Sequence, residues 1–456
     1  MWAWHWFYNM KTVNTKQSSF LLFLLGLGCE TKIYFFGTIA FSELVTFFIA
    51  PLLLLKYWAR MKHDGFLPFL YMLAFMIGGM FISACWNQTP FPFVIKLFAV
   101  FYGMFAFYIV FYILLHDNFK GVGWFFLGSF ISGIITIWAF NPTADVSSSG
   151  FVYIGEAEVE DIIRGPLFWI GKVRGLGQLP ILTAYLKTPL VYSIVTPILF
   201  VAFAMFTTVT GRAQSMCVLI SSVMMLIGRK SRRRIQTIGK HLGLAISVGA
   251  VVLFAYKIVY SYAADNGYLG EEARTKYEHQ TDRGKGSISM LVSGRTEFFI
   301  ALSAIVDHPI IGFGPRASDT GGYAEKFLVK YGTEQDVLGY FLALQRNAAL
   351  GFVRSIPTHS HIMAAWLWCG LPGLIFFLWV LYVIFRHCRY YAFVVPQWYG
   401  YFALIIPTMV WSIFFNPFGA RYSLPLMMVL LLYAKAVGDG KMLLPYELEI
   451  EARKYD

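Results

Sequence analysis

Long apolar segments recur along this chain, and they constrain its fold more than any other feature. A helix needs roughly 20 mostly apolar residues to cross the bilayer core, which is about 30 Å thick. On that scale the chain holds about twelve such segments, beginning near residues 18, 39, 66, 91, 121, 174, 191, 212, 238, 361, 394 and 420. The sequence therefore predicts an all-α integral membrane protein with about twelve transmembrane helices.

Composition agrees with this fold class. Of the 456 residues 58% are hydrophobic and 14% are charged, whereas an ordinary soluble protein carries about a quarter charged residues. Soluble enzymes, disordered chains, collagens and coiled coils are excluded by this balance. The five cysteines lie in or beside apolar segments without metal-binding spacing, so we interpret them as buried small apolar residues.

Basic residues orient the chain, because short loops rich in Lys and Arg stay in the cytoplasm. Such residues follow the second, eighth and tenth segments: Lys56, Arg60 and Lys62; Arg229, Lys230 and Arg232 to Arg234; Arg386 and Arg389. Twelve helices then place both termini in the cytoplasm. If Lys187 to Pro189 did not separate the sixth and seventh segments, the chain would have eleven helices, and the orientation of its C-terminal half would be inverted. The Arg229 to Arg234 loop is too short to predict a nucleic-acid partner.

The same parity predicts the domain organisation. About nine helices occupy residues 1–260, with a smaller outer loop near 141–173; a large outer loop covers 261–358, about three helices cover 359–437, and a cytoplasmic tail covers 438–456. Within the large loop, Phe298, Phe299, Leu302 and Ile305 predict one stripe of an amphipathic helix over residues 295–305. Residues 312–315 then predict a tight turn.

Three arginines lie at predicted outer helix ends or in the large loop: Arg174, Arg212 and Arg295. The planar fork of a guanidinium suits a diphosphate, because it donates paired charge-assisted hydrogen bonds. The alternative is that these side chains extend to the membrane–water interface without a ligand. Arg421, at the start of the last segment, likewise either lines a cavity or anchors its helix at the interface.

Two histidines lead into the tenth segment, His359 and His361, with Gly370 and Gly373 inside the predicted helix. A neutral imidazole at an aqueous helix start can take up a proton near pH 7. Residues at i and i+2 do not share a helical face, which favours one active and one structural histidine over joint metal ligation. The alternative is that both bind only backbone groups.

The acidic cluster Glu156, Glu158, Glu160 and Asp161 has two interpretations. Paired carboxylates could hold a divalent cation, or the cluster belongs to a solvated outer loop. We expect the solvated loop, and therefore no metal site.

His359, Ser360, nine residues, Gly370, two residues and Gly373 resemble the His-[Asn/Ser/Gln]-x9-Gly-x-x-Gly signature of bacterial O-antigen ligases, whose superfamily includes the O-antigen polymerases. The upstream order is similar as well, with an Arg at a span start (Arg212), an Arg in Gly-Arg-x-x-x-Phe (Arg295) and His-Pro-Ile-Ile-Gly-Phe-Gly at 308–314. The resemblance covers roughly residues 174–381.

The resemblance implies a GT-C-like, metal-independent, inverting glycosyltransferase without a cofactor. Such an enzyme transfers a glycan from undecaprenyl diphosphate to a hydroxyl of lipid A-core oligosaccharide in lipopolysaccharide biosynthesis, at the periplasmic face of the bacterial inner membrane. By resemblance, His359 is the catalytic base, and Arg212 and Arg295 hold the diphosphate. Arg174 is a further candidate, although Gly177 to Pro180 depart from the Pro-Asn sequence that the family often has there. His361 and Arg421 are supporting candidates.

Two other functions remain open. A polymerase of the same superfamily would use a second lipid-linked repeat unit as its acceptor and the same arginines. A lipid or polysaccharide transporter would need charges at the membrane midplane and a repeated half, and the sequence contains no convincing internal repeat.

The predicted topology can be tested with single cysteines and a membrane-impermeant thiol reagent. We expect a cysteine at Ser318 to react from outside the cell and one at Ser231 only from inside, since the two positions lie on opposite sides of the membrane. The reverse labelling pattern would contradict the assignment of all the site residues.

Overall fold

The computed structural model of this chain describes residues 15–30, 32–34, 38–116, 118–139, 262, 266, 296–316, 318–331, 355–394, 399–416, 418 and 421–442. The predicted segments beginning near residues 174, 191, 212 and 238 lie outside these residues, as do the loop near 141–173 and the tail from 443 onward. The described residues are mainly helical. Their strands form one short antiparallel hairpin, β1 (Lys32–Tyr34) with β2 (Thr38–Ala40).

Five helices occupy the N-terminal part: α2 (Thr15–Glu30), α3 (Phe41–Asp64), α4 (Leu67–Trp86), α5 (Phe91–His116) and α6 (Val122–Ala139). They begin within a few residues of the predicted segments near 18, 39, 66, 91 and 121. Of the described helices, α3, α4 and α5 are each long and apolar enough to cross a membrane. The structure is thus compatible with a membrane-spanning, largely α-helical protein.

The C-terminal part contains α18 (His361–Cys369), α19 (Leu371–Val394), α20 (Tyr399–Phe415) and α21 (Ser423–Gly438). The prediction that one helix runs on from residue 361 with both glycines inside it is wrong. Gly370 separates α18 from α19 and has a positive φ of +66°, a conformation that side chains with a Cβ rarely adopt. Gly373 lies in the first turn of α19.

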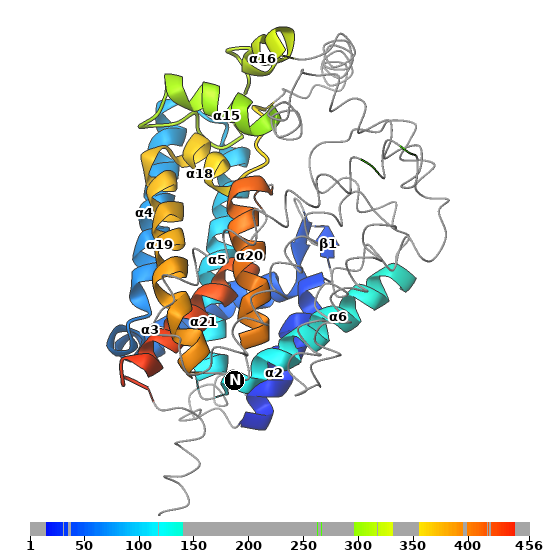
Figure 1. Cartoon of the computed structure of the whole chain (residues 1–456), viewed down its shortest axis with the longest axis vertical. Helices are drawn as coiled ribbons and strands as arrows, with labels where there is room; N and C mark the ends of the chain where they lie inside the picture. Colours follow the sequence, from blue (N-terminus) through cyan, green and yellow to red (C-terminus); the bar gives the residue numbers. More distant parts are fainter. Residues whose placement is uncertain are drawn as a thin grey trace, which may run out of the picture.

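Helices α4, α5, α19 and α20 stand side by side in Figure 1, with α18 across one end of the bundle. Helix α19 packs against both α4 and α21, and α21 packs against α5. Fully buried aromatic side chains fill the interior, among them Phe69, Tyr108 and Phe376. The phenol of Tyr108 donates a hydrogen bond to the carbonyl of Phe66 (2.7 Å), which satisfies the buried polar atom.

Helices α2 and α6 form a separate pair beside this bundle (Figure 1). Glycines allow their backbones to approach closely: a Cβ on Gly26 would lie 1.9 Å from the carbonyl oxygen of Phe125, and one on Gly128 would lie 2.1 Å from that of Phe23. Small residues at such crossings are typical of helices that associate in membranes, where close packing replaces the hydrophobic effect.

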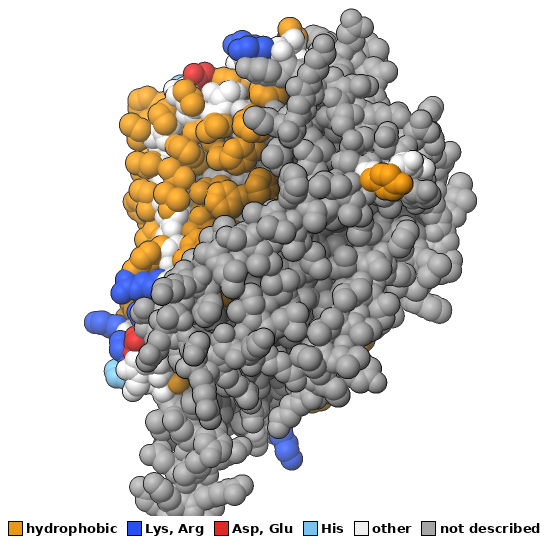
Figure 2. Space-filling view, in the orientation of Figure 1, with side chains coloured by type: hydrophobic (Ala, Val, Ile, Leu, Met, Phe, Trp, Pro, Cys, Tyr) orange, Lys and Arg blue, Asp and Glu red, His pale blue; other side chains and the backbone are white. Residues whose placement is uncertain are grey.

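The outer surface of α3, α4 and α19 is strongly apolar. Figure 2 shows a continuous apolar face with Lys and Arg side chains near its two ends. Exposed residues on these helices include Phe48, Leu55, Phe75, Ile82, Leu378 and Phe385. Exposed apolar surface of this extent marks an interaction with lipid or protein, and here it fits association with a bilayer.

Two further helices cap the end of the bundle at which α18 lies: α15 (Thr296–Asp307) and α16 (Tyr323–Tyr331) (Figure 1). The predicted helix over 295–305 is therefore confirmed for the described residues. Of the predicted stripe, Ile305 is fully buried, and Phe298 and Leu302 are partly buried and pack against the core. The fully buried face also includes Ile300, Ala301 and Ala304. The two alanines are small enough to let α15 pack closely on its neighbour, α18.

A hydrogen bond joins α15 to α16. The phenol of Tyr323 donates to Oδ2 of Asp307 (2.5 Å), and burial together with this bond raises the pKa of Tyr323 to about 12. The phenol therefore remains a donor throughout the physiological pH range. Asp319 caps the start of α16 by accepting from the backbone N–H groups of Tyr323 (2.7 Å) and Ala324 (3.0 Å).

Adjacent glycines on α4 provide a matched test of this packing. A Cβ on Gly79 would lie 2.6 Å from Cβ of Pro372 and 2.7 Å from the carbonyl oxygen of Cys369, whereas one on Gly78 would have no atom within 4 Å. We expect Gly79→Ala to lower the free energy of unfolding by about 1–3 kcal/mol through overpacking. Gly78→Ala should be neutral or stabilise the protein by up to about 1 kcal/mol. Equal effects in thermal unfolding of the detergent-solubilised protein would contradict the packing of α4 on the α18–α19 junction.

Candidate functional site

The candidate site is built on a turn, residues 308–314, that docks onto the end of α18. The backbone N–H of Phe313 donates to the carbonyl of Leu367 (2.7 Å), and that of Leu371 donates to the carbonyl of Ile310 (2.8 Å). The indole N–H of Trp366 donates to the carbonyl of Pro309 (2.7 Å). These bonds join two segments that are about fifty residues apart in the sequence.

Glycines make this docking possible. A Cβ on Gly312 would lie 2.6 Å from the carbonyl oxygen of Leu367, and one on Gly370 would lie 2.2 Å from that of Ile310. A Cβ on Gly373 would lie 2.1 Å from the carbonyl oxygen of Ala365. The glycines of the two sequence motifs are therefore the positions where backbone meets backbone, which gives a physical reason for those residue types.

The same turn is anchored on α4. The side-chain amide of Asn87 donates to the carbonyls of Gly312 (3.1 Å) and Ser83 (2.8 Å). Gly314 lies against Thr89, whose Oγ1 would be 2.3 Å from an added Cβ. The turn, α18 and α4 thus form one packed unit.

His359 precedes α18 in an extended segment whose ends are both held. Ser355 forms an isolated antiparallel bridge with Ser318. Ser360 is buried. Its Oγ donates to the carbonyl of Ile413 (2.9 Å) and accepts from the N–H of Met363 (3.3 Å), as the side chain of a helix N-cap does. The position of His359 is therefore set on both sides by its neighbours in the chain.

Glu297, in the first turn of α15, faces this histidine. Its Oε2 lies 2.7 Å from Nδ1 of His359, and the two side chains are 41% and 39% exposed, respectively. The Nδ1 atom itself is shielded from solvent and makes no hydrogen bond, so its contact with Glu297 is an ion-pair contact and the exposed part of His359 lies elsewhere on the side chain. An imidazole held in this way can exchange a proton with a bound molecule.

His361 has different surroundings, although it lies only two residues further on. It is 3% exposed, and its ring packs against those of Phe418 (5.3 Å between centroids) and Phe377 (6.0 Å). The structure does not bring the two histidines together. Among the described residues, no group of three or more His, Cys, Asp or Glu side chains could hold a metal ion, and the cluster from Glu156 to Asp161 lies outside them.

Arg421 forms a partly buried ion pair within the bundle. Its Nη1 lies 2.9 Å from Oε2 of Glu43 in the first turn of α3, and this oxygen also accepts from the N–H of Ala40 (2.9 Å). Glu43 is 8% exposed. The structure thus pairs Arg421 with a carboxylate, a role that neither prediction for Arg421 included. The sequence feature that could have identified Glu43 is its position as an acidic residue inside an apolar segment.

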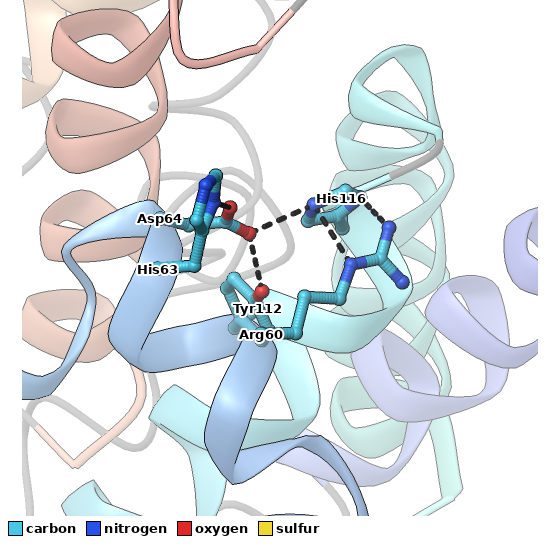
Figure 3. Close-up of polar contacts among 5 residues, drawn as sticks. All are labelled: Arg60, His63, Asp64, Tyr112 and His116. Atoms are coloured by element: carbon cyan, nitrogen blue, oxygen red, sulfur yellow. Dashed lines mark hydrogen bonds and ion pairs between the residues drawn. The ribbon is translucent and has the colours of Figure 1, made fainter.

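A second polar cluster joins the end of α3 to the end of α5 (Figure 3). The buried carboxylate of Asp64 accepts from the phenol of Tyr112 (2.6 Å) and lies 3.1 Å from Nε2 of His116 and 3.2 Å from Nδ1 of His63. The guanidinium of Arg60 also bonds to the ring of His116. The sequence analysis did not predict this cluster, because its members come together only when the two helices pack.

This cluster and His359 lie near opposite ends of α5. The helix has 26 residues, which at about 1.5 Å per residue is roughly 39 Å. His116 is its last residue, whereas its first residue, Phe91, follows the loop that contacts Gly314. Because the length of α5 separates the Asp64 cluster from the candidate site, we interpret the cluster as part of the helix packing.

The predicted diphosphate ligands Arg174, Arg212 and Arg295 lie outside the described residues. In the sequence, Arg295 directly precedes α15, two residues before Glu297. Comparison of the sequence with models of protein families and with curated proteins gives no match.

The pairing of Arg421 with Glu43 predicts coupled effects on stability. Loss of one partner of a fully buried pair costs about 3–5 kcal/mol, but the Arg421 side chain is 35% exposed, so we expect about 1–2 kcal/mol for Arg421→Met. The double variant with Glu43→Gln should recover part of this loss, because no unpaired charge remains. Arg386→Met, at an exposed arginine of α19, is the control for thermal unfolding. Additive losses would contradict the pairing.

Proposed function

We propose that this protein is a membrane-embedded glycosyltransferase of the O-antigen ligase type. It transfers a glycan from an undecaprenyl diphosphate carrier to a hydroxyl of lipid A-core oligosaccharide, at the periplasmic face of the bacterial inner membrane. The proposed topology has about twelve transmembrane helices, with residues 261–358 forming the large periplasmic loop.

The observation that carries the proposal is the interlocking of the two motif segments beneath His359. The turn at 308–314 and the glycines at 370 and 373 belong to the sequence pattern shared with O-antigen ligases. The turn packs directly on Gly370, and Gly373 packs on the carbonyl of Ala365 in α18. This unit holds a partly exposed histidine, His359, at one end of a bundle with an apolar outer face. Such an arrangement is suited to a substrate that has a lipid tail and a polar head.

The proposed chemistry is an inverting displacement. His359 takes the proton of the acceptor hydroxyl while the acceptor oxygen forms a bond to the anomeric carbon. The bond between that carbon and the diphosphate oxygen breaks, and its electron pair leaves with the diphosphate. Arg212 and Arg295, with Arg174 as a further candidate, stabilise the charge that develops on the leaving group.

The ligase reading is preferred over the polymerase because of the His-Ser-x9-Gly-x-x-Gly spacing. Both activities would use the same donor chemistry and the same arginines, and they differ in the acceptor. The test must therefore distinguish the two acceptors.

The first experiment is lipopolysaccharide profiling of a strain that lacks its own ligase, complemented with this chain or with His359→Ala. We expect the chain to restore the O-antigen ladder. His359→Ala should lose most or all of it, since a general base contributes about 10²- to 10⁴-fold. Membrane levels of both proteins, measured by immunoblot, provide the expression control.

A parallel strain that lacks its polymerase is the second arm. Rescue of that strain, without rescue of the ligase-deficient one, would make the protein a polymerase. Full activity of His359→Ala in the ligase-deficient strain would contradict the proposed role of this histidine.

A further inference from the structure

We propose that Glu297 is the positioning residue of His359, acting on its Nδ1 nitrogen so that Nε2 is left bare for the acceptor hydroxyl. This inference rests on the proposed function. It adds a residue that the sequence pattern did not single out and gives α15 a part in the reaction.

The geometry assigns a separate task to each ring nitrogen. Nδ1 lies 2.7 Å from Oε2 of Glu297, an ion-pair contact without hydrogen-bond geometry, and is shielded from solvent, while the side chain is 39% exposed. A carboxylate this close to Nδ1 favours, through its charge, the tautomer that carries the proton on Nδ1. The lone pair of Nε2 is then available to a molecule that approaches from the exposed side.

A carboxylate in this place also stabilises the product of the proton transfer. When the acceptor proton moves to Nε2, the ring becomes an imidazolium whose positive charge lies beside Glu297. The carboxylate keeps its charge and does not accept the proton, so it orients the ring and stabilises its charged form. The bonds formed and broken at the anomeric carbon are unchanged.

The two residues are held by different elements, each fixed by its own contacts. Glu297 belongs to α15, whose buried face includes Ile300 and Ala304 and which packs on α18. His359 is held through Ser360, the N-cap of α18, and its bond to Ile413. The 2.7 Å distance is therefore a consequence of how α15 docks on α18.

The pair is poorly suited to a purely stabilising role. Ion pairs between exposed side chains contribute little to stability, and about two fifths of each side chain is exposed. Replacement of Glu297 should therefore leave the protein folded, which makes its effect on the reaction measurable.

The test is a double-mutant cycle with purified full-length protein in nanodiscs. The probes are undecaprenyl-diphosphate-linked O-antigen and core lipopolysaccharide, both isolated from a ligase-deficient strain. We expect Glu297→Ala to lower kcat by about ten- to a hundredfold, a part of the 10²- to 10⁴-fold typical of a general base, with little change in KM for the donor. Glu297→Gln should be intermediate, because its amide oxygen keeps a partial negative charge near Nδ1 but not the full charge of the carboxylate.

The decisive comparison is made in the His359→Ala background. There Glu297→Ala should have no further effect, because its effect is exerted through the imidazole. Glu325→Ala is the matched control: Glu325 lies in the first turn of α16 as Glu297 lies in that of α15, and it is exposed. An equal loss from Glu297→Ala with and without His359 would overturn the proposal for Glu297 and leave the proposed function standing.

A spectroscopic measurement tests the pair without any activity. In protein labelled with ¹⁵N in its histidine rings, the signal that disappears in His359→Gln is assigned to His359. We expect the signal of the neutral ring to report a protonated Nδ1 and a bare Nε2. Glu297→Ala should abolish that preference, and Glu325→Ala should preserve it.

A protonated Nε2 in the wild-type protein, or a tautomer unaffected by Glu297→Ala, would overturn the proposal. Because this readout needs no substrate, it decides the role of Glu297 even if the lipopolysaccharide ladder is not restored.

Discussion

The docking of the turn at 308–314 on the α18–α19 junction is the contact on which the arrangement around His359 depends. Three backbone or indole hydrogen bonds join the segments, and glycines at 312 and 370 remove the side chains that would keep them apart. The turn directly follows α15 and the junction directly follows α18, so this contact holds together the ends of both helices. The distance between Glu297 and His359 is one result of it.

The two buried acidic side chains in the described part of the bundle are paired where helices meet. Glu43 and Arg421 join the starts of α3 and α21, and Asp64 lies among polar groups that join the ends of α3 and α5. A lone charge would be costly in an apolar interior, whereas a hydrogen-bonded pair fixes how two helices meet. The pair of Glu297 and His359 is different, because it is half exposed and can meet a substrate.

Much of the helical order could be predicted because apolar segment length is a local property. The segments near 39, 66, 91 and 121 became α3 to α6. After α15 the chain turns at 309–311 and at 315–316, whereas one tight turn was predicted over 312–315. The single helix from residue 361 was wrong, since Gly370 has a positive φ and lies against the carbonyl of Ile310, from another part of the chain. The buried face of α15 is wider than the predicted stripe and includes Ile300, Ala301 and Ala304, because its extent depends on which neighbour the helix packs against.

The sequence by itself determined the largely helical, apolar character of the chain and the positions of most described helices, because these follow from local apolar length. The proposed role of His359 rests on residue order along the chain. Only the tertiary structure brought Glu297 to His359 and Glu43 to Arg421. The members of these pairs are 62 and 378 residues apart, and their contacts exist only after the helices have packed. Pairing across such separations is set by the packing of whole helices, which no local pattern records.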